Sequence, residues 1–177
     1  MNKIVYNIVL ALILILSQGL FFNNINLLGS INPFIYIFFI AYFPLKNNRS
    51  LFIFLAFLVG LIIDIFSDTH AIHAAASLTI AFLRPYFMKL YFGIAYEHQV
   101  IKFNSIELKQ NLFYLLSIIL IHHLILYSLE IFDVYKILLV IKNAFSTAIF
   151  TFITIYILFE LILKRTKWER TFYFLLL

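Results

Sequence analysis

Few residues of this 177-residue chain could carry chemistry, and the most distinctive is a carboxylate inside an apolar stretch. Asp64 lies four residues after Gly60, so a helix would place both on one face. An ionised side chain at the centre of a membrane helix costs at least ~2.5 kcal/mol on insertion scales, so its presence needs a reason. The pattern favours a specific structural or interaction role for Asp64. The alternative is a carboxylate near the outer headgroups, followed by Asp68 in a solvated turn.

Histidines form the second group of candidates. His73 follows Asp64 across a short turn, and an Asp–His hydrogen bond that holds a helical hairpin is expected, with a two-residue metal site as the alternative. Two ligands fall short of the four in a structural zinc site. His122 and His123 are adjacent, so they point to different faces of a helix, and at most one is expected to join Asp64 inside a bundle. The spacing is not specific for a metal, and no cofactor is predicted.

Two further charged positions have simpler interpretations. Arg84 and Pro85 fall near the end of an apolar stretch. A long basic side chain there can bury its stem and extend its charged group to the membrane surface, and Arg84 is expected to do this at the cytoplasmic side. Glu130 is expected to be a charge on the outer surface.

Catalytic patterns are missing from the sequence. It has no G-x-S-x-G, H-E-x-x-H or phosphate-binding loop motif, and it has no cysteine to act as a nucleophile or metal ligand. No reaction is selected by these residues, and the chain is predicted not to be an enzyme.

The composition determines what kind of protein must position these residues. Hydrophobic residues make up 64% of the chain and charged residues 12%, with a mean hydropathy of +1.04. Soluble domains are roughly half apolar and a quarter charged. Too few charges are present to cover a water-soluble globule, so an all-α integral membrane protein is predicted. The net charge of +5 then reflects membrane orientation rather than nucleic-acid binding.

Six apolar stretches approach the ~20 residues that a helix needs to cross the hydrocarbon. They predict a single membrane domain, 1–177, built as a six-helix bundle with spans at about 4–22, 27–45, 51–66, 71–88, 111–129 and 137–163. The first stretch could be mistaken for a signal peptide, but it lacks a convincing cleavage site and more spans follow it. Small residues between Ala71 and Ser77 would let neighbouring backbones approach closely.

The distribution of basic residues predicts the orientation. With the N-terminus inside, only Lys136 and Lys142 of the 13 Lys and Arg residues fall on the outer side. The inner side then holds Lys3, Lys46, Arg49, Arg84, Lys89, Lys102, Lys109, Lys164, Arg165, Lys167 and Arg170. Because basic residues favour the cytoplasmic side, both termini are predicted to be cytoplasmic.

Three short segments resemble motifs of the MreD family of rod-shape-determining membrane proteins. Gly60-Leu61-Ile62-Ile63-Asp64 is similar to the family's G-L-x-x-D hairpin, Ala71-Ile72-His73-Ala74 to its G-x-H-A segment, and Leu83-Arg84-Pro85 to an L-R-P tail. Ala71 departs from the pattern, because glycine is expected there. Chain length, span count and short loops also match. The candidate structural and interaction residues are Gly60, Asp64, His73, Arg84, Pro85, His122, His123 and Glu130.

The resemblance implies a non-catalytic scaffold of the bacterial cell-elongation machinery in the cytoplasmic (inner) membrane. Such proteins pair with the bitopic MreC protein and act alongside the actin-like MreB filament, the RodA polymerase and a penicillin-binding transpeptidase during lateral peptidoglycan synthesis. The implied fold is similar to the six-helix substrate-binding subunits of energy-coupling-factor vitamin transporters.

That fold supplies the rival hypothesis, a substrate-binding subunit of a small-molecule transporter. Such a subunit should present convergent polar groups in an outward-facing pocket. The outer half of the predicted bundle offers Asp64, His73, Glu130, Asp133 and little else, which argues against this hypothesis.

Overall fold

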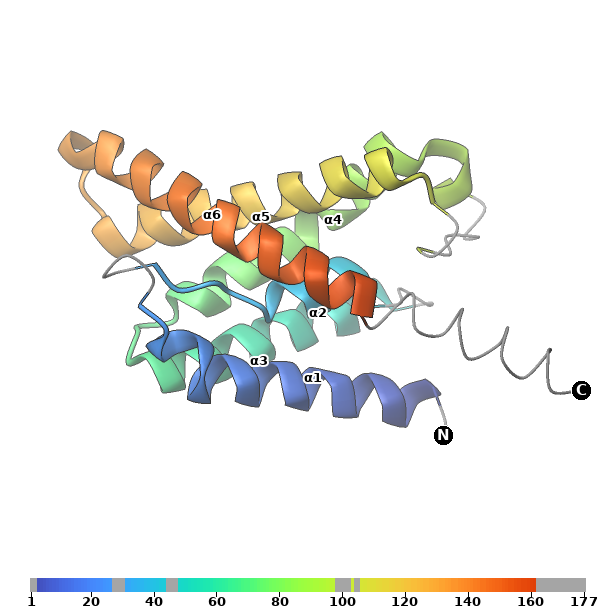
Figure 1. The fold of residues 1–177 in the computed structure, drawn as a ribbon, viewed down its shortest axis with the longest axis horizontal. Helices are drawn as coiled ribbons and strands as arrows, with labels where there is room; N and C mark the ends of the chain where they lie inside the picture. Colours follow the sequence, from blue (N-terminus) through green and yellow to red (C-terminus); the bar gives the residue numbers. More distant parts are fainter. Residues whose placement is uncertain (1–2, 27–30, 44–47, 98–102, 104–105, 162–177) are drawn as a thin grey trace, which may run out of the picture.

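The computed structural model describes residues 3–26, 31–43, 48–97, 103 and 106–161. Over these residues the chain is helical and forms no β-strand, which confirms the predicted all-α class. The helices are α1 (Lys3–Leu20), α2 (Ile37–Tyr42), α3 (Arg49–Ser67), α4 (Ile72–Glu97), α5 (Leu108–Ile131) and α6 (Ile137–Phe159) (Figure 1). Two single 3-10 turns accompany them, η1 (Phe22–Asn24) and η3 (Val134–Lys136).

Within the described part of the chain, three helical segments are long and apolar enough to cross a membrane. They are Arg49–Ser67, Leu108–Ile131 and Val134–Phe159, with mean hydropathies of 2.5, 2.0 and 1.8, and a shorter apolar helix covers Ile8–Asn24. Large apolar side chains such as Ile65, Leu90 and Leu138 are exposed on the outside of the bundle. These features indicate a membrane protein, since such a surface is suited to lipid and unsuited to water.

Neighbouring long helices pack against each other in chain order. α4 lies against α3 and against α5, α6 lies against α5, and α1 runs beside α3 (Figure 1). A side chain at Gly19 would meet the Phe66 ring at 2.5 Å, so α1 and α3 touch closely there. α2 contacts α4, α5 and α6, and all six of its residues are buried. The core therefore surrounds the shortest helix.

The range expected as the second span, 27–45, is not a continuous helix. Residues 27–30 and 44–45 lie outside the described part, and the helix between them covers only Ile37–Tyr42. Residues 31–34 are extended, so the expectation of helix through this part was wrong. Pro33 explains the difference, because proline cannot donate a helical hydrogen bond and disfavours the helical conformation of the residue before it. The helix begins at Ile37, four residues after Pro33.

α4 extends well past its predicted end at residue 88. It continues to Glu97, with Pro85 inside it and a break at Gly93, which has φ +46° and ψ −121°. Arg49 packs on this helix near the proline: its guanidinium carbon lies 4.9 Å from the centre of the Phe82 ring, and its Nη2 donates to the Phe82 carbonyl at 3.0 Å. The basic residues predicted to follow the last span, Lys164 to Arg170, lie outside the described residues.

Candidate functional site

Asp64 links α3 to the first turn of α4. Its carboxylate accepts the backbone N–H groups of His73 at 2.9 Å and Ala74 at 2.8 Å, and the Thr69 hydroxyl at 2.5 Å. N–H groups in a first helical turn have no partner within their own helix, and a negative charge there is favoured by the helix dipole. Asp64 is 3% exposed, so these donors replace its water. The expected Asp–His contact therefore exists, but it is made by the backbone of His73 and not by its imidazole.

The residue that would normally cap α4 cannot do so. Ala71 precedes the helix and has no side-chain acceptor, so Asp64 provides the cap from α3. Ala71 has φ +60°, a left-handed conformation that costs a residue with a Cβ atom roughly 1–2 kcal/mol. This is the position where the resemblance expects glycine. The turn keeps the left-handed conformation that suits glycine although the residue is alanine.

Gly60 allows the two helices to approach. A Cβ atom at Gly60 would lie 2.6 Å from the Ala74 Cα and 2.6 Å from the His73 carbonyl oxygen, which is too close for any side chain. Gly60 and Asp64 thus share the α3 face that meets α4, as their spacing predicted. The small side chains at the start of α4 fit this close contact, as expected from the sequence.

The side chain of His73 belongs to a second group of polar contacts. Its Nδ1 lies 2.9 Å from the Tyr36 hydroxyl, which lies 3.0 Å from Nε2 of His122. A hydroxyl has one hydrogen to donate, so it donates to one ring and accepts from the other. Tyr36 and His122 are fully buried, and this chain of contacts joins the segment before α2 to α4 and α5.

His123 belongs to a separate series of hydrogen bonds. The positions of its ring hydrogens follow from its hydrogen-bond partners. Its Nδ1 lies 2.9 Å from the Ile119 carbonyl, which only accepts, so Nδ1 carries the hydrogen. Nε2 then accepts from the Thr151 hydroxyl at 3.1 Å, and the Thr151 oxygen accepts the Phe34 N–H at 3.0 Å. The expectation that at most one of the adjacent histidines would lie inside was wrong. α5 is covered by α4, α2 and α6, so both of its polar faces are buried.

Gln18 of α1 forms hydrogen bonds with the same segment before α2 that Thr151 of α6 contacts. Its Oε1 accepts the Ile35 N–H at 2.6 Å, and its Nε2 donates to the Pro33 carbonyl at 3.2 Å. Non-helical backbone at membrane depth is tolerated where protein groups satisfy it, and Gln18 and Thr151 supply that here. Neither residue was a sequence candidate. In the sequence, the only sign of such a role is a polar side chain inside an apolar helix, and this does not indicate its hydrogen-bond partner.

Arg84 does not extend to the membrane surface, so that expectation was wrong. Its side chain is 0% exposed; Nε donates to the Tyr114 hydroxyl at 3.1 Å, and the guanidinium carbon lies 5.0 Å from the centre of the Phe52 ring. Nη1 and Nη2 are buried and make no hydrogen bond within the described residues. The reason is the length of α4: residue 84 is in the middle of a helix that begins at Ile72 and first breaks at Gly93, not near its end.

A cavity of about 560 Å³ lies at the end of the bundle where α3 turns into α4 and α5 into α6. This end is at the left of Figure 1, opposite the N-terminus. Glu130 is exposed and lines the cavity. The described residues around it are Asn23, Asn24, Ile31, Asn32, Phe34, Phe66, Ser67, Thr69, Ile72, His73, Leu126, Tyr127, Glu130, Lys142, Asn143, Ser146 and Thr147.

This lining corrects the expectation that the half of the bundle with Asp64 and Glu130 offers few polar groups. The expectation counted charges and histidines, whereas most of the polar lining consists of asparagines and hydroxyl residues. Asn23 shows why these were missed: it lies in a polar turn far from α6 in the sequence, and only the fold brings the two together. The convergence of neutral polar groups depends on helix packing, which residue types alone do not reveal.

The described residues contain no group of three His, Asp or Glu side chains placed to share a metal ion. His73 and His122 instead meet at the Tyr36 hydroxyl. Comparison with protein-family models, with curated proteins and with solved structures finds no match to this chain.

Proposed function

We propose that this protein is a non-catalytic scaffold of the bacterial cell-elongation machinery, crossing the cytoplasmic membrane six times and binding a bitopic partner of the MreC type. The observation that carries the proposal is the α3–α4 hairpin. Gly60, Asp64, His73 and Ala74, which carry the resemblance to the MreD family, come together as one close-packed structural unit. The contacts among these residues hold α3 and α4 in a fixed relative position. A scaffold that binds its partner through a fixed surface requires such an arrangement.

The path of the chain supports the proposed orientation. α1, α3 and α5 run toward the end with the cavity, and α4 and α6 run back (Figure 1). Segment 31–42 provides the remaining crossing, partly as extended chain. Among the described residues, the cavity end carries Lys136 and Lys142, whereas the opposite end carries Lys3, Arg49 and Lys109 at the starts of α1, α3 and α5. By the positive-inside rule the cavity faces outward and both termini are cytoplasmic.

Partner contact in this proposal is made by helix faces. The described loops are short, so they offer little surface for a soluble partner, whereas α3 exposes Phe54, Ile62 and Ile65. Helices in lipid associate through close packing of their surfaces, which requires each helix to be held in a fixed position. The Asp64 cap and the Gly60 contact fix α3 relative to α4.

The proposal predicts that Asp64→Asn weakens the complex with the MreC-type protein. The substitution preserves the shape of the side chain but places an amide NH₂ group where a carboxylate oxygen accepted a backbone hydrogen bond. Buried N–H groups are then left unpaired, which costs about 1–3 kcal/mol of stability each. The measurement is co-purification of the tagged chain with the co-expressed partner in detergent. The control is Asp68→Asn, which changes an exposed carboxylate in the same turn. Loss of the partner with both variants, or with neither, would contradict the assigned role of Asp64.

The cavity favours a second candidate function, a substrate-binding subunit of a small-molecule transporter. Its many convergent polar side chains are the feature that such a subunit requires and that the sequence did not reveal. Under this candidate the chain would bind a vitamin-type molecule from outside and associate with an ATP-driven energising module. The partner recovered with the chain distinguishes the two functions.

A further inference from the structure

The polar groups of the cavity fall into two sets. Some are engaged with each other: the Asn23 amide donates to the Ser67 hydroxyl at 2.9 Å, and the hydroxyls of Tyr127 and Thr147 are 2.7 Å apart. These pairs connect the helices that form the walls, so the shape of the cavity is fixed without a ligand. Its volume of about 560 Å³ lies within the usual ~300–1,000 Å³ range of small-molecule sites.

The second set consists of side chains with no partner among the described residues. Glu130 comes from α5, and Lys142, Asn143 and Ser146 come from α6. None of the four side chains makes a hydrogen bond or ion pair within the described part of the chain, although all four line the same cavity. The cavity therefore offers one negative charge, one positive charge, an amide and a hydroxyl to a ligand.

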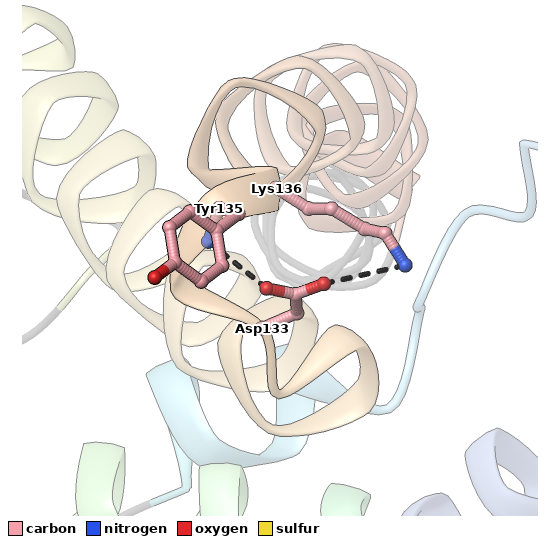
Figure 2. Close-up of polar contacts among 3 residues, drawn as sticks. All are labelled: Asp133, Tyr135 and Lys136. Carbon is pink, nitrogen blue, oxygen red and sulfur yellow. Dashed lines mark hydrogen bonds and ion pairs between the residues drawn. The ribbon is translucent and has the colours of Figure 1, made fainter.

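A neighbouring pair of opposite charges at the same end of the bundle is joined, unlike Glu130 and Lys142. Asp133 and Lys136, in the connection between α5 and α6, bind each other at 3.4 Å, and Asp133 also accepts the Tyr135 N–H at 2.9 Å (Figure 2). That pair lies outside the cavity and its charges are satisfied. Glu130 and Lys142 face one space without joining, so a ligand with both charges can satisfy both.

We propose that the cavity binds a small zwitterion, a molecule with an ammonium group and a carboxylate such as a free amino acid or a short peptide. Glu130 accepts hydrogen bonds from the ammonium group, and Lys142 donates to the carboxylate. Charge-assisted hydrogen bonds of this kind are stronger than neutral ones. Asn143 and Ser146 supply neutral polar contacts, and Phe34 and Ile72 supply apolar surface for the body of the ligand.

The charges also exclude other ligand classes. A sugar or another neutral polyol would leave both ionic groups without a counter-charge. Phosphate would find one lysine and would be repelled by Glu130. The inference rests on the cavity alone and applies under either candidate function, so its failure would leave the partner experiment unaffected.

The test uses the full chain in nanodiscs of neutral lipid. The probes are a tritiated mixture of the twenty amino acids and, separately, tritiated alanyl-alanine, with bound label measured at equilibrium. Saturable binding of at least one probe is expected. Glu130→Gln and Lys142→Gln should each weaken it about tenfold or more, because each removes a charge-assisted hydrogen bond. Both side chains are exposed, so the variants should keep the thermal unfolding midpoint of the parent.

Asp133→Asn and Lys136→Gln are the matched controls, because they change charges at the same end of the bundle outside the cavity. These variants should bind as the parent does. No saturable binding of either probe would overturn the proposal. Equal weakening by the control variants would also overturn it, as would competition by glucose or inorganic phosphate at the same concentrations as the zwitterions.

Discussion

Some residues in this bundle satisfy backbone groups that, in most helical proteins, are satisfied by residues at other positions. A helix is usually capped by the residue that precedes it, whereas α4 is capped by Asp64 of the previous helix. The cost of burying a carboxylate is offset by three donors, and Gly60 one turn earlier brings those donors within reach. The sequence indicated the importance of both residues through their spacing and their apolar surroundings. It did not indicate that the backbone of His73 would be the partner.

Ala71→Gly should stabilise the protein. Ala71 has φ +60°, which glycine adopts without steric strain, so removal of the methyl group should add about 1 kcal/mol to the free energy of unfolding. The midpoint of thermal unfolding in detergent measures this. Ala75→Gly, within α4, is the control and should destabilise by about 0.5–1 kcal/mol, because glycine weakens a helix interior. A lower midpoint for Ala71→Gly would mean that residue 71 does not have a left-handed conformation.

At the scale of the secondary-structure elements, the unusual feature is the segment 31–36 before α2, which is extended at 31–34 and turns at 35–36. Its peptide groups are satisfied by side chains from α1 and α6, so a short non-helical stretch can be buried among long helices. The segment in turn carries Tyr36, which lies between His73 and His122. The position of α2 thus depends on α1 and α6, and the polar contacts of α4 and α5 depend on α2.

Thr151→Val should destabilise the protein, while Thr154→Val should not. Thr151 accepts a hydrogen bond from the Phe34 N–H and donates one to His123. Valine has a similar shape but no hydroxyl, so it leaves two buried partners unsatisfied, which costs about 1–3 kcal/mol of stability each. Thr154 is one turn away in α6 and bonds only the Phe150 carbonyl of its own helix at 2.8 Å. Thermal unfolding of the two variants in detergent measures the difference. Equal midpoints would show that the extended segment does not rely on α6.

The sequence predicted the helical class, the apolar character of the long helices and the shared α3 face of Gly60 and Asp64, because hydrophobic length and residue spacing are local properties. It did not predict the short α2, the burial of both His122 and His123, or the enclosed guanidinium of Arg84. Each of these depends on which helices lie on either side. A histidine face is buried or exposed according to the neighbour that covers it, and that information is not contained in the spacing of the residues.

At the scale of the whole molecule, several polar features of the described residues share one end of the bundle. The cavity, the Asp133–Lys136 pair and the α3–α4 turn lie at this end, and the start of α3 lies at the other (Figure 1). The proposed orientation assigns the cavity to the outside of the cell.

The orientation can be tested by single-cysteine labelling, because the chain has no native cysteine. Tyr135 is 95% exposed at the cavity end, so Tyr135→Cys should react with a membrane-impermeant maleimide added to intact cells. Asn48, before α3, lies at the other end, so Asn48→Cys should react only after the membrane is opened. The reverse pattern would invert the bundle, and labelling of both residues in intact cells would rule out the six-span arrangement.

The proposed scaffold function requires the chain to bind an MreC-type protein in its own membrane. The most direct measurement is identification of the proteins that the tagged chain retains from that membrane. Gentle solubilisation followed by affinity purification and mass spectrometry should recover an MreC-type protein in a near-stoichiometric amount. Asp64→Asn should reduce that amount, and Asp68→Asn should not. Recovery of an ATP-driven transporter module in place of the MreC-type protein would contradict the scaffold function and establish the transporter alternative.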